Sequence, residues 1–276
     1  MPLKDIMLFL RAGEPSIPAL SVAASIARRH DAFISACCLV QAPEAEAADC
    51  YAIGPAAVSD VLQRLDLALA SSVKDCHDAF VEVLGVEAPC VWCLSPPDEE
   101  AARSAGRARL ADLAILGRSP RNEGADRALA EALALHSGAP CLIVPEAYSG
   151  GARLDRIVLG WNGSAEAKRA MEDGLDLLKH ASAVDVVTVG ELAPDRQEHD
   201  AEAVVAHLAR HGIKARAHRV QHQADTAAAL LHCCETLGAS LLVVGAYSHA
   251  RVAEAVLGGV TRTLLAHCPL PVLLSR

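Results

Sequence analysis

The sequence predicts an α/β fold made of two tandem doubly wound, Rossmann-like domains, each with a parallel sheet. Three observations support this. The chain has 276 residues, enough for two domains of about 140 residues each. Apolar runs rich in β-branched residues alternate with helical periodicities, and the same order of elements occurs twice. We therefore expect an internal duplication, with domains at 1–147 and 154–276 and a Gly- and Ser-containing linker between them.

The second half shows the order of elements most clearly. Its first strand, Ile157–Leu159, runs into an Asn-Gly-Ser turn, and Ser164 is a natural N-cap for a helix from about 165 to 180. Gly238 stands where a glycine C-cap is expected. The remaining elements are expected as strands at 184–189, 214–220, 241–245 and 271–275, and as helices at 196–212, 224–237 and 258–267.

The first half repeats this order. Its final segment, 131–146, matches 261–276 and aligns His136 with His267. Strands are expected at 4–13, 33–40, 86–94, 112–120 and 141–145, helices at 16–30 and 98–110, and a helix-rich insert at 56–83. The Ala-, Glu- and Pro-rich segment Gln41–Tyr51 is expected to be a mobile surface loop.

Composition excludes several classes of protein. The net charge of −9 disfavours a nucleic-acid partner, which would require a basic face. Residues 1–150 contain 12 basic and 20 acidic residues, whereas residues 151–276 contain 13 and 14, so an anionic ligand is expected in the second half. No apolar run approaches the roughly 18 residues of a membrane helix, and the N-terminus does not resemble a signal peptide. We therefore expect a cytoplasmic protein that does not enter a membrane.

Cysteines and histidines are numerous, but their spacing does not indicate a metal site. Most of the ten cysteines lie among apolar residues and are expected to be small buried side chains. Cys90 and Cys93 have the CxxC spacing, but on a strand they point to opposite faces, and no second CxxC completes a zinc site. The twelve histidines form no paired-ligand motif, and several are expected at helix ends.

One loop has the pattern of a phosphate-binding site. In an open α/β sheet, ligands bind beyond the carboxyl ends of the strands, which here points to the loop after 241–245. Gly258 and Gly259 open a helix whose N–H groups and positive dipole end suit a phosphate. Thr261 adds a hydroxyl group, and Arg251 or Arg262 could supply positive charge.

The spacing Gly-x2-Ser-x9-Gly-Gly in this loop closely resembles the Gly-x2-Gly-x9-Gly-(Ser/Thr) loop of the universal stress protein family. The resemblance extends over nearly the whole chain and implies a tandem member with adenine nucleotide alpha hydrolase-like domains. It implies ATP or another adenine nucleotide as ligand, with Mg²⁺ bound only together with the nucleotide. The residues that it nominates for binding are Asn162, Val189, Gly245, Ser248, Gly258, Gly259, Val260 and Thr261.

Three of the nominated positions depart from the family pattern. Asn162 stands in place of an aspartate, Ser248 in place of the second glycine, and Gly259 in place of a hydroxyl residue. The first half departs further: its loop is shorter, Pro120 lacks an N–H, and the segment 125–138 offers no glycine before the helix. That half is therefore interpreted as a structural partner that binds no nucleotide.

Three functions stay open at this point. The first is a nucleotide-binding stress or regulatory protein, the second is a weak ATPase or hydrolase with His249 as the candidate group, and the third is an interaction scaffold without ligand. No Walker lysine or nucleophile elbow supports the second, so no catalytic residue is nominated. By resemblance, strands 141–145 and 272–275 are expected to pair within the chain as an intramolecular pseudo-dimer, and a homodimer of whole chains stays open.

Overall fold

A computed structural model describes residues 3–41, 55–85, 89–97, 99–192, 197–198, 200–221, 225–246 and 259–276. Of residues 55–58, 61 and 62 it describes the backbone alone. The expected loop Gln41–Tyr51, apart from Gln41, lies outside the described residues, as do Ser248, His249, Arg251 and Gly258.

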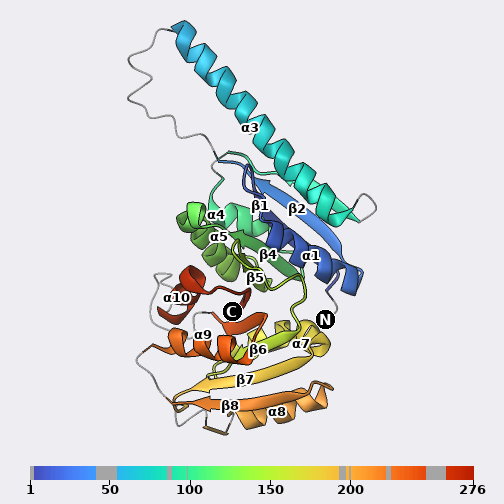
Figure 1. Cartoon of the computed structure of the whole chain (residues 1–276), viewed down its shortest axis with the longest axis vertical. Helices are drawn as coiled ribbons and strands as arrows, with labels where there is room; N and C mark the ends of the chain where they lie inside the picture. The colour runs from blue at the N-terminus through green and yellow to red at the C-terminus, as the bar shows by residue number, and fades with distance from the viewer. Residues whose placement is uncertain are drawn as a thin grey trace.

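The described strands form one continuous ten-stranded sheet in the order β3-β2-β1-β4-β5-β10-β9-β6-β7-β8 (Figure 1). Five neighbouring strands come from each half of the chain, in the same relative order. The strands are β1 Asp5–Arg11, β2 Phe33–Leu39, β3 Cys90–Leu94, β4 Leu113–Arg118, β5 Cys141–Pro145, β6 Arg156–Gly160, β7 Ala183–Val189, β8 Ala215–Val220, β9 Leu241–Gly245 and β10 Val272–Ser275.

The two halves meet at β5 and β10, the antiparallel pair in an otherwise parallel sheet. Val272 is paired with Ile143 and Leu273 with Leu142. The expected pairing of these two segments within one chain is therefore confirmed. It covers two strand edges that would otherwise present unpaired N–H and C=O groups to another chain.

Helices lie on both faces of the sheet, as the alternation of elements predicts (Figure 1). Ser16, Ser164, Asp200 and Asp225 each accept a backbone N–H bond at a helix start, which satisfies donors that a helix leaves unpaired. The α-helices are α1 Ile17–His30, α3 Pro55–Leu84, α4 Ala101–Ala105, α5 Glu123–His136, α6 Ala165–Asp173, α7 Leu175–His180, α8 Ala201–Arg210, α9 Thr226–Leu237 and α10 Gly259–His267, with 3₁₀ turns η1 Gly106–Ala108 and η2 Pro120–Asn122.

Several predicted helices differ in extent from the observed ones. The single helix expected at 165–180 is two helices, because Gly174 interrupts it. The helix expected at 196–212 begins only at Ala201, since the Asp200 side chain caps it there. The helix expected at 98–110 is reduced to α4 and η1.

The insert expected at 56–83 is one 30-residue helix, α3, which extends well beyond the sheet (Figure 1). This helix packs on α1, and its Cys76 and Phe80 side chains are buried in the apolar cluster to which α1 also contributes. No helix in the described part of the chain is both long and apolar enough to cross a membrane.

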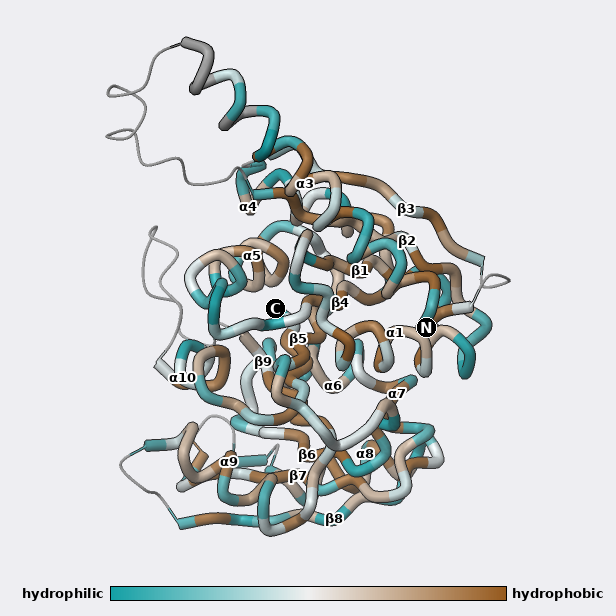
Figure 2. Tube along the Cα trace, turned by 45° about the horizontal axis from the view of Figure 1, so that its top comes forward, coloured by the Kyte–Doolittle hydropathy of each residue, from teal (hydrophilic) through white to brown (hydrophobic). Residues whose placement is uncertain are grey.

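The core lies on both faces of the sheet, because each central strand is covered by helices on both sides. Along β1, Leu8 belongs to one apolar cluster and Phe9 to the cluster on the other face, and both are 0% exposed. Figure 2 shows most strands as largely hydrophobic along their length, whereas hydrophobic and hydrophilic residues alternate along the helices. The continuous apolar runs in the sequence are thus explained by burial on both faces.

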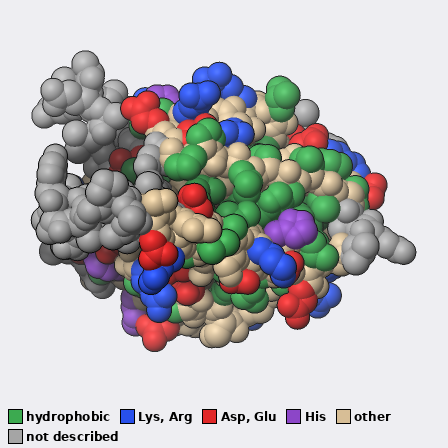
Figure 3. Space-filling model, turned by 90° about the horizontal axis from the view of Figure 1, so that it is seen from above, with side chains coloured by type: hydrophobic (Ala, Val, Ile, Leu, Met, Phe, Trp, Pro, Cys, Tyr) green, Lys and Arg blue, Asp and Glu red, His purple; other side chains and the backbone are tan. Residues whose placement is uncertain are grey.

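The two outer strands differ in character. In β3, Val91 and Leu94 are about half exposed, whereas β8 contains Arg216 and Arg219. Figure 3 looks down onto the end of the molecule with β3 and α3, and hydrophobic side chains gather across that face. Charged side chains on an edge strand discourage pairing with another chain, a protection that β8 has and β3 lacks.

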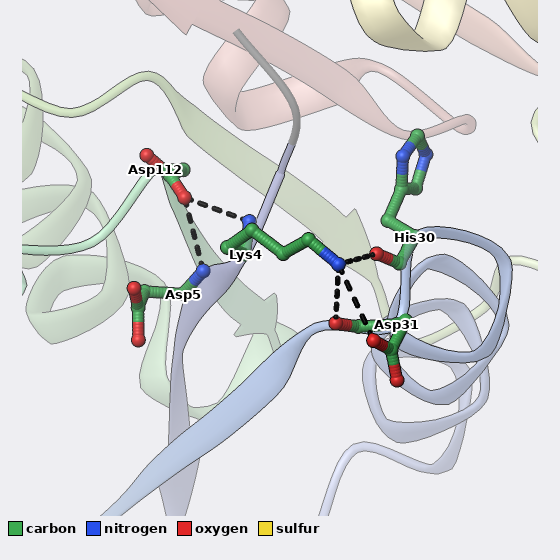
Figure 4. Close-up of polar contacts among 5 residues, drawn as sticks. All are labelled: Lys4, Asp5, His30, Asp31 and Asp112. Atoms are coloured by element: carbon green, nitrogen blue, oxygen red, sulfur yellow. Dashed lines mark hydrogen bonds and ion pairs between the residues drawn. The ribbon is translucent and has the colours of Figure 1, made fainter.

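The beginning of β1 is held by charged groups (Figure 4). The carboxylate of Asp112 accepts the backbone N–H groups of Lys4 and Asp5 at 2.7 and 3.0 Å. The ammonium group of Lys4 donates to the carbonyl oxygens of His30 and Asp31 at 2.8 and 2.9 Å. Because these carbonyls lie at the C-terminus of α1, the cation stabilises the negative end of the helix dipole.

Candidate functional site

A cavity of about 320 Å³ lies in the second half, at the carboxyl ends of β6, β7 and β9. The chain continues from β6 to β7 on one side, while β9 lies on the other side of β6. This is the point of the half-sheet where strand order reverses, and α/β folds bind ligands at such points. The cavity is lined by Gly160, Trp161, Asn162, Ala167, Val187, Val189, Glu191, Leu192, Thr226, Leu230, Val244, Gly245, Gly259, Val260, Thr261 and Leu264.

The deepest part of the cavity is apolar. Val187, Leu230 and Leu264 are buried and belong to the same hydrophobic cluster. Val189, nominated by the sequence, is half-buried at the end of β7 and also lines the cavity. An apolar floor with a few polar groups at its rim is the usual composition of a small-molecule site.

Asn162 lies at the rim, in the turn between β6 and α6. Its carboxamide oxygen accepts the N–H of Ser164 at 3.1 Å, and the Ser164 hydroxyl oxygen accepts the N–H of Ala167 at 3.1 Å. Gly163, between them, has a φ of 69°, which an L side chain rarely adopts. The amide at this position therefore orders the start of α6 as well as facing the cavity.

Gly245 ends β9, and the structure gives a packing reason for glycine there. A Cβ on Gly245 would lie 2.5 Å from the backbone nitrogen of Ala167 and 2.5 Å from the backbone carbon of Glu166. The first turn of α6 therefore lies directly against this residue. Glycine is needed for the approach of α6 to β9, in addition to any contact with a ligand.

Gly259, Val260 and Thr261 form the first turn of α10 at the opposite side of the cavity. Among the described residues, a Cβ on Gly259 would have no neighbour within 4 Å. Thr261 is 5% exposed. The free N–H groups of this first turn and the positive end of the helix dipole make it the natural place for an anion.

Positive charge is scarce among the described lining residues. Glu191 is the one ionisable side chain among them, and it is acidic. Arg262, a candidate from the sequence, is exposed outside the cavity, and its charge acts instead on Glu131 of α5. An anion would therefore depend on backbone N–H groups unless residues outside the described ranges add a cation.

The corresponding place in the first half is filled by protein. The Asp126 carboxylate, 1% exposed, lies 2.5 Å from Nε of Arg11 and accepts the N–H of Ser119 at 2.8 Å. Burial raises the pKa of Asp126, and the charge of Arg11 opposes this shift. The Asp126 carboxylate thus already binds the N–H of Ser119 and the guanidinium group of Arg11, which are two groups that could otherwise bind an anion there.

Sequence reasoning missed this ion pair, because the two residues are 115 positions apart. The internal repeat offers one signal for Asp126. When His136 is aligned with His267, Asp126 lies one position before the residue that corresponds to Gly258 of the phosphate-binding loop. The last helix of this half begins before the segment 125–138, in which the sequence offered no glycine before the helix. α5 begins at Glu123, and Gly124 lies in its first turn. The remaining cavity beside Asp126 measures only about 10 Å³.

A family model described as the universal stress protein family matches residues 153–276. This half of the chain is therefore a domain of the universal stress protein family. Asn162, Gly245 and the first turn of α10 all fall within the matched segment. A search of curated proteins found no match to the chain.

Solved structures share the fold of the entire chain. A universal stress protein from Archaeoglobus fulgidus aligns over 98% of this chain and 96% of its own length, with a TM-score of 0.66 and 14% identity. A functionally unknown protein from Pseudomonas aeruginosa aligns over 99% and 92%, with a TM-score of 0.60 and 15% identity.

The cytoplasmic domain of a prokaryotic cation chloride cotransporter also aligns, over 99% of this chain and 95% of that domain, with a TM-score of 0.51 and 13% identity. The fold of this chain therefore occurs in proteins of different kinds. Fold alone does not assign a ligand, and function must be argued from the site.

Proposed function

We propose that this protein binds an adenine nucleotide, with ATP as the leading candidate, in the cavity of its second half and acts in a stress response or its regulation. The observation that carries the proposal is one cavity lined both by buried apolar side chains and by the first turn of α10. The apolar floor suits a purine, and the helix N-terminus suits a phosphate.

The nominated residues would contact different parts of the nucleotide. Asn162 and Val189, at the ends of β6 and β7, would contact the base and ribose. Gly245, Gly259, Val260 and Thr261 would surround the phosphates, together with Ser248 and Gly258. Because Glu191 is the one charged side chain among the described lining residues, backbone N–H groups would supply most of the phosphate binding there. Mg²⁺ would arrive with the nucleotide.

The first half would act as a structural partner. Its anion position is occupied by Asp126, which makes a second nucleotide site unfavourable. The chain would then be an intramolecular pseudo-dimer of one binding and one non-binding domain, located in the cytoplasm. In this proposal the non-binding domain comprises residues 1–147 and the binding domain comprises residues 154–276.

Calorimetric titration of ATP into the wild type and Gly259→Glu tests the proposal. The new side chain meets no described residue and has a favourable position at a helix N-terminus, so the variant should fold while its carboxylate repels phosphate. Gly124→Glu is the matched control, because Gly124 also lies in the first turn of a helix and its Cβ would have no described neighbour within 4 Å. We expect ATP binding in wild type and Gly124→Glu, and its loss in Gly259→Glu.

The other two functions give different results in this experiment. Absence of binding in a wild type freed of co-purified nucleotide would contradict the proposal and favour the scaffold. Steady release of inorganic phosphate from bound ATP, abolished in His249→Ala, would indicate a weak ATPase. Equal loss of binding in both glutamate variants would show that the cavity is not the site.

A further inference from the structure

Strands β2 and β3 bring two cysteines together in the first half. Cys37 and Cys93 are register partners on β2 and β3, and the two side chains are close enough for Cys93 to raise the pKa of Cys37. Both lie on the face of the sheet that packs against α4 and α5. Neighbouring strands are about 4.8 Å apart, which lies within the 4.4–6.8 Å range of Cα separations in disulfides. A bond between the two sulfur atoms is therefore compatible with the positions of both strands.

Access to the two thiols is unequal. Cys37 is 0% exposed, whereas Cys93 is partly exposed on the outermost strand. Burial raises the pKa of Cys37 to about 12, with Cys93 as the next contributor. An oxidant from solvent would therefore meet Cys93 first, and Cys37 would be the second thiol to react.

A fixed positive charge accompanies the pair. The charge of Arg107 acts on both thiols. Its guanidinium group is held by the carboxylate of Glu99 through bonds of 3.1 and 3.0 Å, and Glu99 also accepts the hydroxyl of Ser104 at 2.9 Å. A cation close to a thiol favours the thiolate, which is the reactive form.

We propose that Cys93 and Cys37 form a peroxide-sensitive dithiol site that closes to a disulfide between β2 and β3. The Cys93 thiolate attacks one oxygen of a hydroperoxide, so that an S–O bond forms, the O–O bond breaks, and hydroxide or alkoxide leaves and takes up a proton. Cys37 then attacks the sulfenic sulfur, which forms the S–S bond, breaks the S–O bond and releases water with the Cys37 proton. The two thiols supply the two electrons that reduce the peroxide.

This site is independent of the nucleotide cavity, which lies in the other half of the chain. It also differs from the CxxC pair in the sequence, because Cys90 and Cys93 point to opposite faces of β3. The disulfide would link the apolar edge strand covalently to its neighbour.

The test is oxidation of the full chain by hydrogen peroxide in a Cys50→Ser, Cys90→Ser background. Cys90 is exposed and Cys50 lies outside the described residues, so their removal limits competing reactions. Intact mass should fall by two hydrogen atoms, and peptide mapping at acidic pH should identify a Cys37–Cys93 link that dithiothreitol reverses. In an added Cys37→Ser variant the link should be lost, and Cys93 should be trapped as a sulfenic acid by a cyclic diketone.

Two internal controls lie in the same chain. Cys38 and Cys76 also lie close enough to shift each other's pKa, but both are 0% exposed, so they should stay reduced in the folded protein. Cys233 is partly exposed like Cys93 and should react more slowly, because burial raises its pKa. Cys93 that stays reduced, reacts no faster than Cys233, or links to another cysteine would overturn the proposal. A Cys93→Ser variant that still loses two hydrogen atoms would do so as well.

Discussion

The Nε atom of Arg11 lies 2.5 Å from a carboxylate oxygen of Asp126, and this ion pair joins the end of β1 to the first turns of α5. Both side chains are at least nine-tenths buried. In the second half the corresponding space is the cavity. This buried ion pair is therefore a main difference between the two halves: it fills the space in the first half, whereas the second half has room for a ligand.

The first prediction concerns the stability of this pair. Asp126→Ala should destabilise the protein by about 3–5 kcal/mol, because it leaves a buried guanidinium without its partner. The double variant Arg11→Met, Asp126→Leu should recover most of this loss, because neither charge is then buried. Urea unfolding of the single and double variants measures both values. If the double variant were no more stable than Asp126→Ala, the prediction would be wrong, and the polar contacts of the pair would contribute to stability beyond the cost of an unpaired buried charge.

The second prediction concerns pH. The rings of His30 and His180 lie 5.0 Å apart at the ends of α1 and α7, and Nε2 of His30 is buried with no hydrogen-bond partner among the described residues. Burial lowers the pKa of His30 from 6.5, and His180, Arg29 and Lys4 lower it further while Asp176 opposes them. Since the unfolded chain binds this proton more readily, stability should fall as pH drops below about 6.5.

Urea unfolding between about pH 5 and pH 8 checks this expectation. His30→Phe keeps an aromatic ring at the contact and should flatten the dependence on pH. His267→Phe, at an exposed helix end, is the control and should leave the dependence unchanged. An unchanged slope in His30→Phe would mean that other groups cause the acid sensitivity.

The third prediction concerns two glycines. Gly245→Ala should cost about 1–3 kcal/mol or more, because its Cβ would lie 2.5 Å from backbone atoms of α6 that cannot rotate away. Gly124→Ala meets open space in a helix and should stabilise the protein by about 0.5 kcal/mol. Thermal unfolding of both variants gives the comparison. Equal tolerance at the two positions would contradict the close approach of α6 to β9.

The fourth prediction concerns a link between the halves. Arg118 of β4 donates hydrogen bonds to the carbonyl oxygens of Leu265 and Cys268, the latter at 2.7 Å, at the end of α10. Burial lowers the pKa of Arg118, but the group stays charged at neutral pH. Arg118→Met should therefore destabilise the protein by about 1.5–3 kcal/mol.

Arg121→Met is the control for this variant, since the Arg121 side chain is 81% exposed and a surface substitution usually changes stability by less than about 0.5 kcal/mol. Chemical unfolding followed by circular dichroism compares the two. If Arg118→Met cost no more than Arg121→Met, the bonds to α10 would not contribute to stability.

Much of the architecture was predictable from local patterns. Apolar runs marked the central strands of both halves, because strands covered on both faces are apolar along their length. Ser164 marked the start of α6, because its side chain accepts a backbone N–H three residues along the chain. Gly238 marked the end of α9, because it adopts the left-handed conformation that ends many helices. The repeat and the resemblance then indicated how the strands at 141–145 and 272–275 would pair.

Local patterns could not predict which distant side chains meet. Helical periodicity continues through Gly174, so the break between α6 and α7 was missed. The cysteine spacing directed attention to Cys90 and Cys93, whereas the tertiary structure places Cys93 against Cys37. Asp126 was unremarkable in the sequence until the fold brought Arg11 to it.

The sequence by itself therefore determined the duplication, the strands and the position of the loop before α10. The tertiary structure decided that one half contains a cavity while the other is closed by an ion pair, and that two thiols lie side by side. The physical reason is that burial periodicity and capping are encoded within a few residues. Contacts across a sheet or between a strand and a helix depend instead on the packing of segments that the chain separates by tens of residues.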